Sequence, residues 1–256
     1  MRRLHRERIR VGNDMIFYFH SRPQSASEVP LVLIHGVAGT ADWWMKNVEG
    51  LNHRFEVYAP DLPGFGFSPV GAKPFDIDLE ASALTQWLAA VGVTRAILVG
   101  HSMGGYLASK LALSDPRSVA ALVLVDPAIF PTEYGWRRLV LGLIRAPLHL
   151  SLDIWPTLLC GLVDAGLITI FRAVRDLLTR VMLDELSAMR VPSLLIWGKH
   201  DSVVPLSVAA RIKSALGNQA TGPMLLSGGH IPMWDDAARF NDDVLRFLSG
   251  LGLDRP

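Results

Sequence analysis

The sequence predicts an α/β protein with a mostly parallel central sheet that is covered by helices on both faces. Short runs rich in Val, Ile and Leu recur along the chain, and such runs are typical of strands buried on both faces. Helical patterns separate many of these runs, and this alternation indicates parallel strands joined by crossover helices. The predicted buried strands cover 31–36, 55–61, 95–100, 121–126, 193–198 and 223–228.

The remaining elements complete this pattern. Two strand-like runs, 8–12 and 15–21, are joined by the turn residues Asn13 and Asp14 and predict an opening antiparallel hairpin. With the hairpin, the predicted sheet has eight strands. The helical patterns that separate or follow the strands cover about 42–51, 78–91, 102–114, 205–216 and 235–249.

One long segment after the sixth predicted strand interrupts the alternation. It holds helical apolar patterns and several prolines but no clear strand. A connection of this length inside a compact domain needs structure of its own. We therefore predict a helical cap over 130–188, inserted into a core made of 1–129 and 189–256. Its apolar residues either line a lipophilic pocket or pack the cap helices against each other.

Composition narrows the function classes. The chain has 256 residues, of which 50% are hydrophobic and 19% are charged, and its formal net charge is +1. This balance fits one large core and gives no basic surface for nucleic acid. Cys160 is the single cysteine, so no disulfide framework or thiolate metal cluster is expected. We expect no cofactor, no metal and a small-molecule partner.

The same reasoning bears on location. The basic N-terminus lacks the apolar stretch of a signal peptide, and the most apolar region, about 139–171, is interrupted by charged residues and proline. No uninterrupted apolar run reaches the ~20 residues that span a bilayer. We expect a cytoplasmic protein without a transmembrane segment. A homodimer is among the oligomeric states that the sequence allows.

The stretch Gly100-His101-Ser102-Met103-Gly104 carries the clearest chemical signal. It follows a predicted strand and opens a predicted helix, which is the context of a nucleophile elbow. In such an elbow the serine hydroxyl projects above the sheet, and the amide of Met103 at the helix start points toward an oxyanion. The alternative is that Ser102 merely caps the helix.

A serine nucleophile needs a base, and the base needs an orienting acid. Asp201 follows the predicted strand 193–198, and His230 follows the next strand, so both lie at the carboxyl edge of the sheet. The order serine, acid, histidine favours Asp201 and His230 over the rival acid Asp126 and the rival base His200.

These motifs together resemble the α/β-hydrolase superfamily, in its cap-bearing branch of serine esterases and C–C hydrolases. The resemblance covers nearly the whole chain. It rests on "HGVAG", "PDLPGFGFS", "GHSMGG", "LLIWGKHDSVVP" and "GGHIPMWDDAARFNDDVLRFL".

The resemblance implies site roles. It implies that the backbone amide of Val37 is the second oxyanion donor, beside Met103. Ser102 stands where the haloalkane dehalogenase and epoxide hydrolase branches need a carboxylate, which argues against both. A tryptophan usually follows the histidine in C–C hydrolases of ring-fission products, and Ile231 stands there instead. His35 resembles a residue that fixes the turn.

The sequence thus predicts a serine hydrolase of small to medium lipophilic carboxylic esters, acting through an acyl-enzyme. Hydrolysis of a C–C bond or a lactone on the same residues is an alternative, and a ligand-binding receptor that keeps the triad is another. The expected catalytic residues are Ser102, Asp201 and His230. Trp234, Ile231 and Trp155 are the expected pocket walls.

Overall fold

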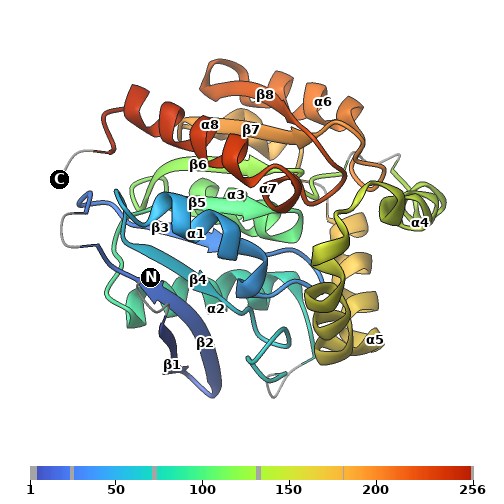
Figure 1. Cartoon of the computed structure of the whole chain (residues 1–256), viewed down its shortest axis with the longest axis horizontal. Helices are drawn as coiled ribbons and strands as arrows, with labels where there is room; N and C mark the ends of the chain where they lie inside the picture. The colour runs from blue at the N-terminus through green and yellow to red at the C-terminus, as the bar shows by residue number, and fades with distance from the viewer. Residues whose placement is uncertain (1–4, 24–25, 71–73, 131–133, 181, 255–256) are drawn as a thin grey trace.

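The computed structural model of the chain describes residues 5–23, 26–70, 74–130, 134–180 and 182–254. Its centre is an eight-stranded sheet with the strand order β1-β2-β4-β3-β5-β6-β7-β8 (Figure 1). The predicted fold class is confirmed. Parts of the predicted core and cap, including 131–133 and 181, lie outside the described residues, and the predicted domain bounds stay a prediction.

The sheet is mixed only at one edge. β1 pairs antiparallel with β2, and β2 pairs antiparallel with β4, while the pairs from β4 through β8 are parallel. The predicted hairpin is the start of this edge. The strands are β1 His5–Val11, β2 Asp14–Ser21, β3 Leu31–Ile34, β4 Val57–Pro60, β5 Ala96–His101, β6 Val119–Val125, β7 Ser193–Gly198 and β8 Ala220–Leu226.

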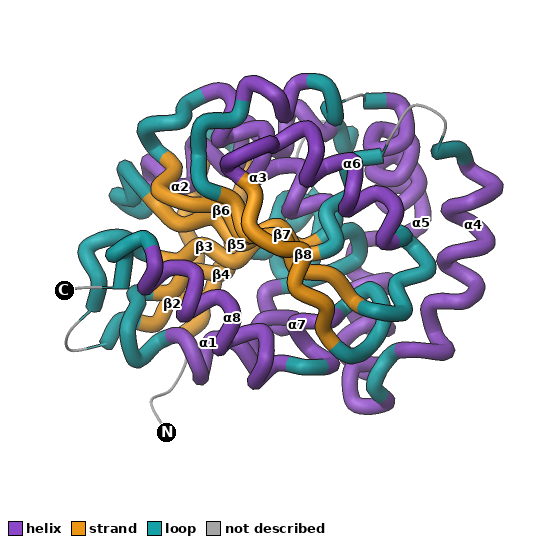
Figure 2. The backbone as a smooth tube through the Cα atoms, turned by 90° about the horizontal axis from the view of Figure 1, so that it is seen from above, coloured by secondary structure: helices purple, strands orange, loops and turns teal. Residues whose placement is uncertain are grey.

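Helices cover both faces of the sheet, as Figure 2 shows from above. α2, α3 and α6 pack in the apolar core on one face, and α1 and α8 pack in the core on the other. The helices are α1 Met45–Leu51, α2 Ile77–Ala90, α3 Met103–Ser114, α4 Trp136–Arg145, α5 Trp155–Thr179, α6 Leu206–Leu216, α7 Pro232–Asp235 and α8 Ala237–Gly250.

Continuous apolar runs give these strands two buried faces. Along β3, Val32 and Ile34 pack on the α2–α3 side, while Leu31 and Leu33 pack on the α1–α8 side. Successive side chains of a strand point to opposite faces, so a strand without polar alternation must be covered twice. This is why the sequence pattern predicted the layers correctly.

The cap helices α4 and α5 follow β6 and lie at the side of the sheet where the parallel strands end (Figures 1 and 2). A Cβ on Gly161 of α5 would lie 2.1 Å from the carbonyl oxygen of Ala38, so α5 touches the turn after β3. Ser202 Oγ donates a hydrogen bond of 2.8 Å to Gly142 O, which joins α4 to the loop after β7. The cap therefore covers two of the loops that carry predicted site residues.

One helical stretch of the cap, Leu152–Thr179, is long and apolar enough to cross a membrane by length and composition alone. The expectation from the sequence concerned uninterrupted apolar runs, and this stretch is interrupted by Asp153, Asp164, Arg172, Arg175 and Asp176. The expected lack of a transmembrane segment therefore stays a prediction. The stretch is not one straight rod. Gly166 has φ 69° and ψ 152°, which divides α5 by a kink that glycine adopts without steric cost.

Candidate active site

Ser102 occupies a strained turn between β5 and α3. Its φ is 52° and its ψ is −114°, a conformation in which few residues other than glycine are found. A Cβ on Gly104 would lie 2.2 Å from Ile34 O on the neighbouring strand, and a Cβ on Gly100 would lie 2.3 Å from Gly104 O in the helix. Both glycines of the motif are therefore required by close backbone approach. Ser102 makes no side-chain cap to α3, which removes the capping alternative.

The structure brings Ser102, His230 and Asp201 into one hydrogen-bonded chain. His230 Nε2 lies 3.2 Å from Ser102 Oγ, and His230 Nδ1 lies 2.8 Å from Asp201 Oδ2. The Asp201 carboxylate accepts the Nδ1–H of the ring, which leaves Nε2 free to take the serine proton. The three residues come from the ends of β5, β7 and β8, as the chain order predicted.

Asp201 is held in place by the turn that follows it. Its Oδ1 accepts hydrogen bonds from the amides of Val203 at 2.7 Å and Val204 at 3.0 Å. These two donors fix the carboxylate and stabilise its negative charge. Oδ2 remains available for His230, so the acid is oriented before any substrate arrives.

Asp126, the rival acid, lies beside Asp201 in a different state. It is fully buried, its Oδ1 accepts the amide of Gly198 at 3.1 Å, and its Oδ2 has no hydrogen-bond partner among the described residues. Burial and then the charge of Asp201 raise the pKa of Asp126 well above its usual range. Burial and this neighbouring charge therefore favour the protonated form of Asp126, next to the carboxylate that contacts the histidine.

The rival base His200 lies outside this chain of contacts. Its side chain is exposed and its ring stacks on His149 of the cap, with centroids 4.7 Å apart. This pair joins the loop after β7 to the cap. The contact accounts for His200 without a role as a base.

His101 is a site residue that the sequence analysis passed over. Its Nε2 lies 2.6 Å from the backbone oxygen of His230, and a carbonyl only accepts, so this nitrogen carries the hydrogen. Burial is the main reason that the pKa of His101 lies well below its usual range, which keeps the ring neutral. The position of His101 directly before the nucleophile was the one sequence signal for a role in the site. Its contact with His230, 129 residues away, follows only from the fold.

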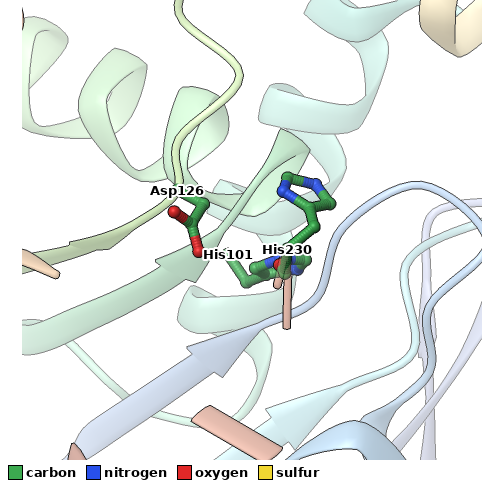
Figure 3. A group of neighbouring side chains, drawn as sticks. All are labelled: His101, Asp126 and His230. Carbon is green, nitrogen blue, oxygen red and sulfur yellow. The ribbon is translucent and has the colours of Figure 1, made fainter. Parts of the chain in front are cut away.

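His101, Asp126 and His230 form the cluster in Figure 3, in which one ligand-type atom from each lies within 4.8 Å of the others. Both ring nitrogens of His230 are engaged, with Asp201 and with Ser102. His101 Nε2 is engaged as well. A metal ion here would have to displace the triad contacts, so the cluster fits proton transfer better than metal binding.

Two backbone amides face the space above Ser102. Met103 is the first residue of α3, so its N–H has no acceptor within the helix. A Cβ on Gly36 would lie 2.9 Å from Ser102 Cβ, which brings the following residue, Val37, to the same place. Neither amide donates to a backbone acceptor within the described ranges. The oxyanion-binding role that the resemblance implies for both amides stays a prediction.

The loop before the site is held by His35 and Asp61. His35 Nδ1 donates to Gly36 O at 2.7 Å and its Nε2 accepts the amide of Leu62 at 3.0 Å. Burial lowers the pKa of His35 to about 4, so the ring stays neutral in both roles. Asp61 accepts the amides of Ala41 and Phe67 at 2.7 and 3.0 Å. The expected turn-fixing role of His35 agrees with these contacts.

A pocket of about 100 Å³ opens beside Ser102. The cap contributes four aliphatic walls to it, and no lysine or arginine lines it within the part of the chain that the structure describes. Its lining residues besides Ser102 and His230 are Val37, Trp43, His101, Ala128, Phe130, Leu139, Leu143, Val174, Leu177 and Val203.

None of the three predicted pocket walls lines this space. Ile231 is buried in the α1–α8 core, and Trp155 begins α5 away from the pocket. Trp234 Nε1 donates to Asp153 Oδ1 at 3.0 Å and its ring lies under Lys46. Trp234 was expected in the pocket because it lies close to His230 in the sequence. The short helix α7 instead turns its ring toward Asp153 of the cap.

The profile of the alpha/beta hydrolase family matches residues 31–243, which include Ser102, Asp201 and His230. The chain belongs to this family.

A relative of this alpha/beta hydrolase in Paraburkholderia phymatum is named 2-hydroxy-6-oxononadienedioate/2-hydroxy-6-oxononatrienedioate hydrolase. The two are 33% identical over an alignment 266 residues long, and the alignment covers 90% of each chain. A solved membrane phospholipase A, described as a bacterial virulence factor, is 26% identical with a TM-score of 0.82, over 96% of this chain and 86% of that one. The enol-lactonase from Burkholderia xenovorans is 20% identical with a TM-score of 0.79, over 95% of this chain and 100% of that one, and shows the shared fold. This alpha/beta hydrolase is therefore a triad hydrolase of small molecules.

Proposed function

We propose that this alpha/beta hydrolase cleaves the carbon–carbon bond beside the ketone of a 2-hydroxy-6-oxo-dienoic acid. The observation that carries the proposal is the match, over 90% of both chains, to a relative named for such a reaction. The triad distances supply the chemistry that this reaction needs. This reaction was the alternative in the sequence analysis, and the comparisons favour it over ester hydrolysis.

In the proposed mechanism Ser102 Oγ gives its proton to His230 Nε2 and bonds to the ketone carbon. The oxygen of that carbonyl becomes an oxyanion, which accepts hydrogen bonds from the amides of Val37 and Met103. Collapse breaks the carbon–carbon bond. The substrate reacts as its 2,6-dioxo tautomer, in which the proton of the 2-hydroxyl has moved to carbon 5. The electron pair of the broken bond then passes through the carbon 3–carbon 4 double bond onto the 2-oxo oxygen, and the resulting dienolate takes the proton from His230 and leaves as the dienol. Water that His230 deprotonates then releases the acyl group as an acid and restores Ser102.

The pocket favours a substrate whose 6-oxo end is apolar. The substrate for which the relative is named is a dicarboxylate, and a second carboxylate would need a cationic partner when it leaves water. The described lining of the pocket offers aliphatic and aromatic side chains such as Leu143, Val174 and Phe130. We therefore propose an alkyl or aryl group, rather than a carboxylate, on the acyl side of the bond.

Hydrolysis of lipophilic carboxylic esters is the second candidate. It is favoured by the same apolar pocket and by Ile231, which follows the histidine where C–C hydrolases usually have tryptophan. The steps are the same, except that an alcohol leaves in place of the dienol. Because an alcohol leaves without forming a carbanion, ester hydrolysis does not require the site to stabilise one.

The test compares rates on one enzyme preparation. The substrates are a 2-hydroxy-6-oxo-dienoic acid with an alkyl group at carbon 6, its dicarboxylate analogue, an enol-lactone and p-nitrophenyl esters. We expect the highest kcat/KM for the alkyl dienoic acid. Faster turnover of the esters would favour the second candidate, and the dicarboxylate as best substrate would contradict the apolar acyl site. Tight binding without turnover of any compound would indicate a receptor.

A further inference from the structure

The outer face of the cap is unusually apolar for a surface in water. Of the nineteen large hydrophobic side chains that are exposed among the described residues, thirteen lie between Trp136 and Phe171. Patches of this kind mark interaction sites rather than ordinary surface. The six most exposed side chains are between 68% and 86% accessible and belong to Ile144, Leu148, Leu152, Val163, Leu167 and Ile168.

This apolar face is continuous from α4 to α5. The rings of Trp136 on α4 and Phe171 on α5 stack with centroids 5.5 Å apart, although both remain exposed. Both helices lie together on the outside of the molecule in two perpendicular views (Figures 1 and 2). Leu143 belongs to the exposed face and also lines the pocket beside Ser102, so the face extends to the mouth of the site.

Unpaired arginines accompany the apolar side chains. Arg137, Arg138 and Arg145 on α4 and Arg172 on α5 have no ion pair with any described residue. Arg137 lies three and four positions before Val140 and Leu141, so it shares their exposed side of the helix. Long arginine stems lie along apolar surface while their charges reach polar groups, which suits a boundary between hydrocarbon and anions.

Between residues 136 and 179, the acidic residues do not balance these charges. Asp153 pairs with Lys46 at 2.6 Å, and Asp176 is buried and pairs with Arg175 at 2.7 Å. Asp164 is the acid left on the exposed side of α5. The face is thus both apolar and cationic.

We propose that the α4–α5 face of the cap binds reversibly to the surface of an anionic lipid bilayer. An amphipathic helix with arginines beside its apolar residues lies in the plane of the headgroups, with its apolar side chains in the acyl boundary. A spanning role for α5 does not fit, because the helix is kinked at Gly166 and because buried Asp176 accepts the amide of Ile77 at 3.2 Å. The contact of Asp176 with Ile77 and the close approach of Gly161 to Ala38 hold α5 against the core on both sides of the kink.

A second copy of the chain fits the face less well. A two-fold dimer sets the same patch against itself, so the unpaired arginines of one copy would meet those of the other. An anionic membrane offers the opposite charge. It also offers lipophilic compounds at the pocket mouth, although the inference does not depend on which bond the site cleaves.

The test measures co-sedimentation with vesicles of phosphatidylcholine alone and of phosphatidylcholine mixed with phosphatidylglycerol. One variant combines Val163→Ser, Leu167→Ser and Ile168→Ser, and its matched control combines Leu206→Ser, Leu225→Ser and Leu251→Ser, which are exposed leucines outside the cap. A second variant combines Arg137→Gln, Arg138→Gln and Arg145→Gln, and its control combines Arg8→Gln, Arg10→Gln and Arg95→Gln.

We expect the wild type to bind the anionic vesicles and both cap variants to bind at least about tenfold more weakly, because each arginine contributes up to about fivefold. Both controls should bind as the wild type does. All variants should keep the far-UV circular dichroism spectrum of the wild type, which shows that they fold.

Failure of the wild type to bind anionic vesicles would overturn the proposal, as would unchanged binding of the cap variants. Equal binding to neutral vesicles with no effect of the Arg→Gln changes would overturn its anionic part. If the Ser variant instead converts a dimer to a monomer and vesicles never bind, the face is an interface between copies of the chain.

Discussion

The imidazole of His101 donates a hydrogen bond of 2.6 Å to the backbone carbonyl of His230. The residue before the nucleophile therefore holds the loop that carries the base. The two rings also lie 4.8 Å apart, and the ring of His101 is buried and neutral. The elbow and the base loop are joined by this contact, so the distance between Ser102 and His230 depends on it.

The contact makes His101 a positioning residue with a measurable effect. His101→Phe should lower kcat about 10- to 100-fold with little change in KM, because the freed carbonyl lets His230 move. It also leaves a partly buried carbonyl unpaired, which costs at most about 1–3 kcal/mol of stability. His101→Gln, whose amide can donate at a similar place, should recover most of kcat. Equal loss in both variants would contradict a role through this hydrogen bond.

Ser102→Ala should abolish turnover of both dienoic acid and ester probes while the fold remains. The removed hydroxyl is the group that lies 3.2 Å from His230, and loss of such a serine costs about 10⁶-fold in kcat in a comparable triad. Hydrolysis and far-UV circular dichroism are measured on one preparation. A folded variant with near wild-type rates would remove Ser102 as nucleophile.

The two buried carboxyls should respond differently to the same change. Asp201→Asn removes the charge that orients His230 and should lower kcat about 10⁴-fold. Asp126→Asn changes a carboxyl that is not the hydrogen-bond partner of His230 and whose pKa burial raises well above the usual range, so kcat should stay within about tenfold. The pair is compared by single-turnover rates at neutral pH. A reversed order of effects would make Asp126 the orienting acid.

The fold was predictable because each strand carries its own signal. Runs such as 31–34 and 121–125 are apolar at every position, which only a strand covered on both faces needs. The turn around Ser102 was predictable because Gly100 and Gly104 mark close backbone approach. Local sequence patterns were therefore sufficient to predict most of the architecture.

Contacts between distant segments were not predictable in this way. The walls Leu139 and Leu177 come from cap helices whose orientation no local pattern determines. The hydrogen bond of His101 joins segments 129 residues apart. Trp234 was misplaced because its ring direction follows from the packing of α7 against Asp153. The cytoplasmic location and a homodimer stay predictions.

Glu80 on α2 should make stability depend on pH. It is buried, its Oε2 has no partner among the described residues, and burial and then the charges of Asp14 and Asp76 raise its pKa well above the usual range. The folded state therefore keeps a proton that the unfolded state loses near pH 4.3, so the free energy of unfolding falls as pH rises above that value.

Glu80→Gln removes this titration. Its advantage over the wild type should be near zero around pH 4 and should grow by about 1.4 kcal/mol per pH unit until the folded pKa is reached. Urea unfolding across this pH range measures the difference, with the exposed Glu49→Gln as control. A difference that is constant with pH would show that Glu80 does not hold its proton in the folded state.

The pocket should set the preferred acyl length of the substrate. Each methylene that leaves water contributes about 0.8 kcal/mol, so KM for p-nitrophenyl esters should fall about fourfold per carbon until the space is full. With a pocket of about 100 Å³, that point should come at short chains. Leu177 of α5 is buried and lines the pocket beside Ser102.

Leu177→Ala should therefore move the minimum of KM to longer acyl chains, because the removed side chain leaves room next to the scissile carbonyl. Leu178→Ala is the matched control, since Leu178 packs partly buried against the core and does not line the pocket. Its KM profile should match that of the wild type. If Leu177→Ala folds and also keeps the wild-type profile, acyl selectivity lies instead in the walls from the core, such as Val37 and Phe130, and the cap serves to cover the site from above.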